Sequence, residues 1–160
     1  MSVNNVEIYQ VEKHMETAIA SLLFGVCTNI YKSRQNRDLA SSRVELKAIL
    51  GENVEHRKIF PQNGGPPQDA FDAWTGAIEI TVATNRSVDA DVDNHSMLLG
   101  AVRARLTNRY LRANFTHPII AITDIRDSGT LDSFVDENDI DISVLSFYTL
   151  VNIKPEAWLE

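Results

Sequence analysis

The sequence is poor in cysteine, in basic residues and in long apolar runs, and each shortage excludes a class of protein. Cys27 is the single cysteine, so no internal disulfide can form, which fits a reducing compartment. No apolar run approaches the roughly 20 residues of a membrane helix, and the polar N-terminus lacks a signal-peptide core. We therefore expect a cytosolic protein that makes no membrane contact. A net charge of −7, from 15 basic and 22 acidic residues, argues against a general nucleic-acid coat.

Metal-binding and catalytic motifs are missing as well. The four histidines do not stand at the spacing of a zinc site, and there is no glycine-rich phosphate loop and no G-x-S-x-G motif. Asp89, Asp91 and Asp93 imitate the start of a calcium loop, but the turn glycine and the bidentate glutamate of such a loop are absent. We expect no metal, no cofactor and no catalytic residues, and so no enzyme.

Alternating apolar residues predict a half-buried sheet. In the clearest run, 74–84, the side chains of Ile78, Ile80 and Val82 alternate with polar ones. This pattern gives the strand one buried face and one solvent-exposed face. We expect the rest of the chain to pack on this strand. Further strands are predicted at 43–50, where Gly51 ends the run, at 119–126 and at 140–153, while 53–60 is ambiguous. Near residue 144 the apolar parity shifts, which indicates either a bulge or a second half covered on both faces.

Apolar residues at three- and four-residue steps predict two helices, over about 5–25 and about 94–113. Residues 31–42, 61–70 and 127–139 read as loops, the last of them acidic. The predicted order is helix, strand, strand, strand, helix, strand, strand. The sequence therefore predicts one α+β domain over residues 1–160, with a mixed, mostly antiparallel sheet of four to five strands packed by two helices.

Charges of opposite sign gather in two places. Three arginines fall on one line of the second predicted helix: Arg105, Arg109 and Arg112. The acidic loop and its end carry five carboxylates: Asp132, Asp136, Glu137, Asp139 and Asp141. One interpretation is that both are solvated surfaces. The other is that they meet across a subunit boundary, where two unlike patches form a heterologous contact that can close into a ring.

Large aromatic residues lie in or beside the predicted loops: Phe71, Trp74 and Trp158. A monomer that leaves such residues exposed favours assembly, because large exposed apolar patches mark interaction sites. The alternative is that these side chains anchor the core. Together with the charged residues, they make up the predicted subunit interface.

Several local phrases also resemble a known family. They are Asp-Ala-Trp-Thr-Gly at 72–76 before the central strand, the small, arginine-rich run 99–106, Ile-Thr-Asp-Ile-Arg-Asp-Ser-Gly at 122–129 and Lys-Pro-Glu-Ala-Trp at 154–158. With the order of elements, they resemble the tail terminator (tail completion) proteins of long-tailed bacteriophages over roughly residues 40–160. The first helix and residues 31–42 match no phrase of that family.

The resemblance implies a structural, non-enzymatic protein of the phage tail or neck. Its members form a homohexameric ring that caps the tail tube, ends its polymerisation and joins it to the head connector. The implied partners are the tail tube protein and the head–tail connector or stopper protein, with DNA passing through the bore without sequence-specific binding. The acidic balance suits such a conduit, because a repelling wall lets DNA slide. Alternatives are a head-closure, stopper or adaptor protein of the neck, or a small ligand-binding or hydrolytic α+β domain.

Overall fold

The computed structural model describes residues 5–33, 35, 39, 41–59, 68–86 and 94–158, which form one five-stranded sheet with helices. The elements follow in this order: α1 (Asn5–Leu22), β1 (Ile30–Lys32), β2 (Arg43–Ile59), β3 (Gln68–Asn85), α2 (Asn94–Arg105), α3 (Asn108–Asn114), β4 (Ile120–Val135), β5 (Ile140–Ile153) and the 3-10 helix η1 (Pro155–Trp158). The predicted α+β class is confirmed. The third α-helix and the short strand β1 were not predicted.

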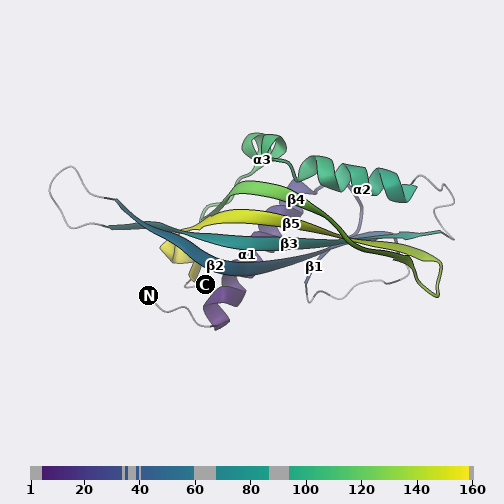
Figure 1. The fold of residues 1–160 in the computed structure, drawn as a ribbon, viewed down its shortest axis with the longest axis horizontal. Coiled ribbons are helices and arrows are strands. Elements are labelled where there is room, and N and C mark those ends of the chain that lie inside the picture. Colours follow the sequence, from purple (N-terminus) through teal and green to yellow (C-terminus); the bar gives the residue numbers. More distant parts are fainter. Residues whose placement is uncertain are drawn as a thin grey trace.

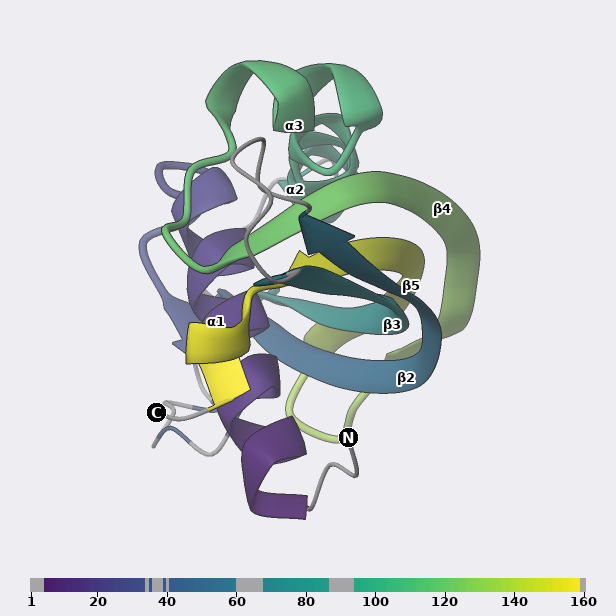
Figure 2. The same ribbon diagram turned by 90° about the vertical axis from the view of Figure 1, so that its left-hand side faces the viewer.

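The sheet has the order β1-β2-β3-β5-β4, so β3 is its central strand, as the sequence predicted. Only β1 and β2 pair in parallel, and the other neighbours are antiparallel. Figure 1 shows the strands running along the long axis of the molecule, with α2 and α3 beside β4 and α1 behind the sheet. In Figure 2 the sheet is strongly curved, and α1 lies against its hollow side.

The core lies between α1 and one face of the sheet. The apolar stripe of α1 is fully buried, including Val11, Met15 and Ile19, and it faces the alternate residues of β2, β3 and β5. The helix packs tightly on β3 at Gly76, where an added Cβ would lie 3.0 Å from Met15 Cε and 2.9 Å from Thr149 Oγ1. A side chain at this position would crowd Met15 and Thr149 and force their side chains to shift, so glycine favours the close packing here.

The second predicted strand does not stop at Gly51. β2 continues to Ile59, and its pairing with β3 shifts register between Leu50 and Asn53, as at a β-bulge. At Gly51 an added Cβ would lie 2.5 Å from Thr75 Oγ1, and this hydroxyl accepts a hydrogen bond from Glu52 N. Glycine here permits the irregularity instead of ending the strand. The predicted 61–70 loop is also too long, since 68–70 belong to β3; the remainder lies outside the described residues.

The predicted single helix over 94–113 is two helices. The chain leaves the helical conformation at Thr107, whose φ of −112° and ψ of 155° are extended. The Thr107 hydroxyl accepts a hydrogen bond from Tyr110 N and so forms the N-cap of α3. The three arginines therefore do not share one helical line, because Arg105 ends α2 while Arg109 and Arg112 lie on α3.

The predicted acidic loop over 127–139 is mostly strand. β4 extends to Val135, and its three register shifts against β5 each add a residue on the β4 side, so the bulges are in β4 and not in β5. The last of them, between Thr130 and Asp132, lies opposite Leu145 and Val144, near the expected position. Strand β5 has the predicted bounds, though β2, β3 and β4 are longer. From Ser143 to Ile153 every second residue of β5 is buried, while the opposite face is only partly covered.

Candidate functional site

Strands β4 and β5 extend past the helices and form a projecting hairpin at one end of the molecule (Figure 1). We call residues 130–141 the β4–β5 arm, and its turn, Asp136 to Asp139, the acidic tip. Three large apolar side chains of the arm are exposed: Leu131 at 59%, Phe134 at 46% and Val135 at 45%. A single chain leaves this apolar surface in water, which is typical of a surface that another molecule covers.

Asp136 holds the acidic tip in shape. Its carboxylate accepts hydrogen bonds from Asn138 N at 2.8 Å and from Ile140 N at 3.0 Å. Asp139 adopts a left-handed conformation with φ of 59°, which closes the turn. The Glu137 and Asp139 side chains are exposed, and within the described chain neither carboxylate forms a hydrogen bond or an ion pair, although the charge of Asp139 acts on nearby Arg86. The tip is therefore held in shape and carries two exposed negative charges.

An ion pair fastens the base of the arm to β3. Arg86 donates to both carboxylate oxygens of Asp141, from Nε at 2.8 Å and from Nη2 at 3.0 Å. The hydrogen bond to Asp141, together with its charge, raises the pKa of the Arg86 guanidinium further above its usual range. Arg86 N also donates to the Asp139 carbonyl at 3.1 Å. Of the five predicted acidic residues, Asp136 and Asp141 thus serve the hairpin itself.

The three predicted arginines differ in what they contact. Arg105 Nη1 donates to the carbonyls of Leu22 and Phe24, both at 3.1 Å, and its guanidinium lies 5.0 Å from the Tyr110 ring centroid. Arg105 therefore ties α2 to the end of α1, which is a structural role. Arg109 and Arg112 are exposed on α3, and neither side chain has a partner among the described residues.

The aromatic residues are less exposed than the sequence suggested. Trp158 on η1 is only 3% exposed and belongs to the core, so the expectation that a monomer leaves it exposed is wrong. Trp74 packs against it with ring centroids 5.5 Å apart, and the η1 helix brings the two rings together. Phe71 on β3 is partly buried. The two tryptophan side chains therefore anchor the core.

A partly buried histidine network joins α2 to the sheet. His95 Nδ1 lies 2.9 Å from Thr84 Oγ1 on β3, His95 Nε2 lies 2.8 Å from Ser143 Oγ on β5, and Ser143 Oγ lies 3.0 Å from Ser133 Oγ on β4. The serine–histidine contact resembles half of a nucleophilic pair. Ser143, however, is only 1% exposed, and a hydroxyl stands where a triad has its carboxylate. Burial lowers the pKa of His95, which favours a neutral ring that clamps three strands to α2.

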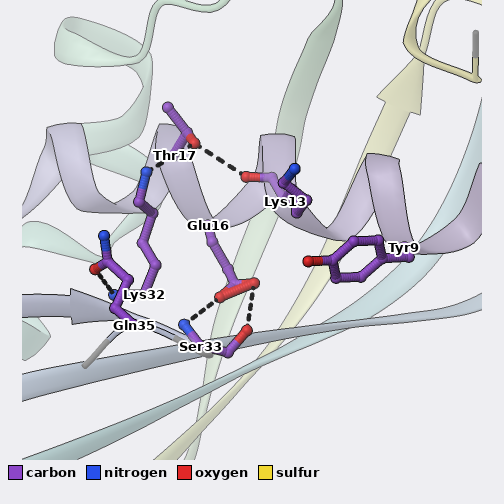
Figure 3. A pocket seen from close by; sticks show the side chains of 7 residues that line it. All are labelled: Tyr9, Lys13, Glu16, Thr17, Lys32, Ser33 and Gln35. Atoms are coloured by element: carbon purple, nitrogen blue, oxygen red, sulfur yellow. Dashed lines mark hydrogen bonds between the residues drawn. The ribbon is translucent and has the colours of Figure 1, made fainter. Parts of the chain in front are cut away.

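A small pocket lies between α1 and the residues after β1 (Figure 3). Its volume is about 190 Å³, and Lys13 and Lys32 contribute ammonium groups to its wall. We call it the lysine pocket. Sequence reasoning missed it, because Lys13 reads as part of an ordinary polar helix face and Lys32 as part of a loop. Only the parallel pairing of β1 with β2 brings Lys32 beside α1.

Among the residues that the structure describes, no group of three or more His, Cys, Asp and Glu side chains is placed to hold a metal ion. No helix in the described ranges is long and apolar enough to cross a membrane.

Comparison of the sequence with known protein families and with curated proteins finds no match. Among solved structures, a chain in the virion of a native gene transfer agent (GTA) particle has a similar fold, with a TM-score of 0.51 and 17% sequence identity. The match covers 89% of this chain and 93% of that chain. A second solved structure, whose name describes no function, has a TM-score of 0.49 and 6% identity over 92% and 94% of the two chains, and carries no argument. At 17% identity, the likeness to the gene transfer agent chain shows a similar fold and no more.

Proposed function

We propose that this protein is a structural component of a phage tail or neck. In this proposal it forms a homohexameric ring that caps the tail tube, ends its polymerisation and joins it to the head connector. DNA passes through the bore, whose acidic character limits sticking. The protein works by assembly in the virion after synthesis in the host cytoplasm, and not by catalysis.

The observation that carries the proposal is the β4–β5 arm. It presents apolar side chains to water, and its acidic tip has two exposed carboxylates that form no hydrogen bond or ion pair within the described chain. In a single chain this apolar surface stays in contact with water, whereas a neighbouring subunit in the proposed ring would bury it. The virion source of a chain with a similar fold supports the same proposal.

A ring needs two unlike surfaces on each subunit, and the charges supply a pair of them. Glu137 and Asp139 lie on the acidic tip, while Arg109 and Arg112 lie on α3, which Figure 1 shows away from the tip. We place the arginines on the positive side of the boundary, with Phe71 as an accessory apolar contact. Exposed charges of this kind fix register and speed association more than they add affinity.

Native mass spectrometry, together with electron microscopy of the protein alone and mixed with tail tubes, tests the proposal. We expect six copies in a ring at the tube end. The double variant Arg109→Glu with Arg112→Glu should lower the assembled mass at modest salt, while Arg126→Glu, an exposed arginine on β4, should not. A ring that binds the connector but not the tube indicates a head-closure or stopper protein. A protein that stays monomeric even beside tail tubes contradicts the proposal.

A further inference from the structure

We infer that the lysine pocket of one subunit receives a carboxylate of the acidic tip, Glu137 or Asp139, from the neighbouring copy. The inference rests on the proposed ring and names the contact that joins its subunits. It combines a concave site that has surplus positive charge with a projecting turn that has surplus negative charge. The two lie apart within one chain, so a second copy must bring them together (Figure 1).

The size of the lysine pocket limits what it can hold. About 190 Å³ corresponds to roughly six waters and is smaller than the ~300 Å³ at which sites for drug-sized ligands begin. A nucleotide or a folded peptide segment does not fit. One acidic side chain does, and a turn that projects from its own subunit is suited to insert one.

The walls of the pocket are held by internal hydrogen bonds. Glu16 is 4% exposed, and its carboxylate accepts from Ser33 N at 2.7 Å and from Ser33 Oγ at 3.0 Å. Lys32 N donates to Gln35 Oε1 at 2.7 Å, which fixes the turn after β1 (Figure 3). The site therefore exists before a ligand arrives, and little ordering is needed on binding.

The charges of the pocket do not balance. Lys32 Nζ reaches Thr17 Oγ1 at 3.5 Å, and Lys13 Nζ lies 5.4 Å from the Tyr9 ring centroid, but neither ammonium forms an ion pair with a described carboxylate. Glu16 supplies one negative charge against two positive ones. An incoming carboxylate would neutralise the remainder and accept hydrogen bonds from the two lysine ammonium groups.

The acidic tip is complementary to this site in charge. Asp136 and the Arg86–Asp141 ion pair keep the turn rigid, and the two neighbouring carboxylates, Glu137 and Asp139, are left exposed. Arg109 and Arg112 are less suited to seat a carboxylate, because they lie exposed on a helix where salt screens them. In the ring, the two arginines attract the acidic tip over a longer distance, while the lysine pocket binds its carboxylate directly.

A charge-swap cycle tests the inference. The pocket variant is Lys13→Glu with Lys32→Glu, the tip variant is Glu137→Lys with Asp139→Lys, and the third protein combines all four changes. The readout is the dissociation constant of the assembly, from native mass spectrometry and analytical ultracentrifugation. Each double variant should weaken assembly at least about tenfold, and the combined protein should recover most of the loss. Lys47→Glu with Lys154→Glu, two exposed lysines outside the pocket, is the matched control.

Folding is checked by circular dichroism, and the milder pair Lys13→Gln with Lys32→Gln serves if the reversal unfolds α1. Pocket variants that assemble like the wild type, in a wild-type protein that does form rings, overturn the inference and leave the proposed ring intact. Loss in both double variants without recovery in the combined protein also overturns it, because the two sites then act separately. A wild-type protein that never assembles overturns both proposals.

Discussion

The middle of the sheet and the β4–β5 arm are made by the same two strands, yet they are built differently. In the middle, every second residue of β5 is buried in the core that α1 and η1 also form, and Phe147 and Leu145 are fully enclosed. In the arm, β4 is exposed from Leu131 to Val135, and among the described residues Ser133 connects this stretch to α2 through the His95 network. The stability of the fold is concentrated in the middle, so the arm is free to serve contacts without endangering the fold.

Truncating one phenylalanine in each region should show the largest difference. Phe147→Ala removes a fully buried ring and should lower the free energy of unfolding by about 3 to 5 kcal/mol. Phe134→Ala, in the arm, should cost less than about 1 kcal/mol, because much of that side chain already contacts water. Urea unfolding of both variants in the same assembly state measures this. Equal losses would mean that the arm is part of the folding core.

Two glycines provide a finer comparison. Gly76→Ala should lower the free energy of unfolding by about 1 to 3 kcal/mol, because the new Cβ meets Thr149 and Met15 at 3.0 Å or less. Gly100→Ala, on α2, should raise it by about 0.5 to 1 kcal/mol, because that position is open and alanine favours helix. Thermal and urea unfolding of both variants test this. If Gly76→Ala is neutral, α1 does not pack as closely on β3 as the structure has it.

The sequence predicted the middle of the molecule well and the arm poorly, for a physical reason. The α1 stripe and the Ile78–Ile80–Val82 alternation follow directly from the period of each element, because both are buried on one face. The 127–135 segment is polar and contains Ser-Gly, so its local pattern favours a loop. It becomes strand because it pairs with β5, a long-range contact that local pattern does not record.

The candidate site was predicted only in part. The sequence itself shows where the charged residues Glu137, Asp139, Arg109 and Arg112 stand. The hydrogen bonds that commit Arg105 and Asp136 within the chain depend on where α1, α2 and the turn lie in space. The break at Thr107 was missed because apolar residues recur on both sides of it, which hides the N-cap in a continuous helical pattern.

The His95 network lies where the arm joins the middle, and it should make that junction sensitive to pH. Burial lowers the pKa of His95 in the folded state, so the unfolded chain, with a value near 6.5, takes up a proton more readily. The contribution of neutral His95 to the free energy of unfolding is therefore complete above about pH 6.5. It is lost as the pH falls through the lower pKa that His95 has in the folded state. Urea midpoints from pH 5 to 8 for the wild type and His95→Gln measure this. Parallel profiles for the two proteins would show that His95 does not contribute.

The smallest effect should come from the ion pair at the base of the arm. The Arg86 side chain is 55% exposed at the pair, although that of Asp141 is 22% exposed, so Arg86→Gln should leave the urea midpoint almost unchanged. It should still loosen the acidic tip, because the side chain links β3 to β5 next to the turn. Amide hydrogen exchange at Asn138 and Ile140 should become faster, whereas Arg126→Gln, which breaks the Arg126–Asp124 pair within β4, should leave these amides unaffected. Unchanged exchange in the Arg86 variant would mean that Asp136 alone keeps the tip rigid, and assembly should then depend on Asp136 rather than on the ion pair.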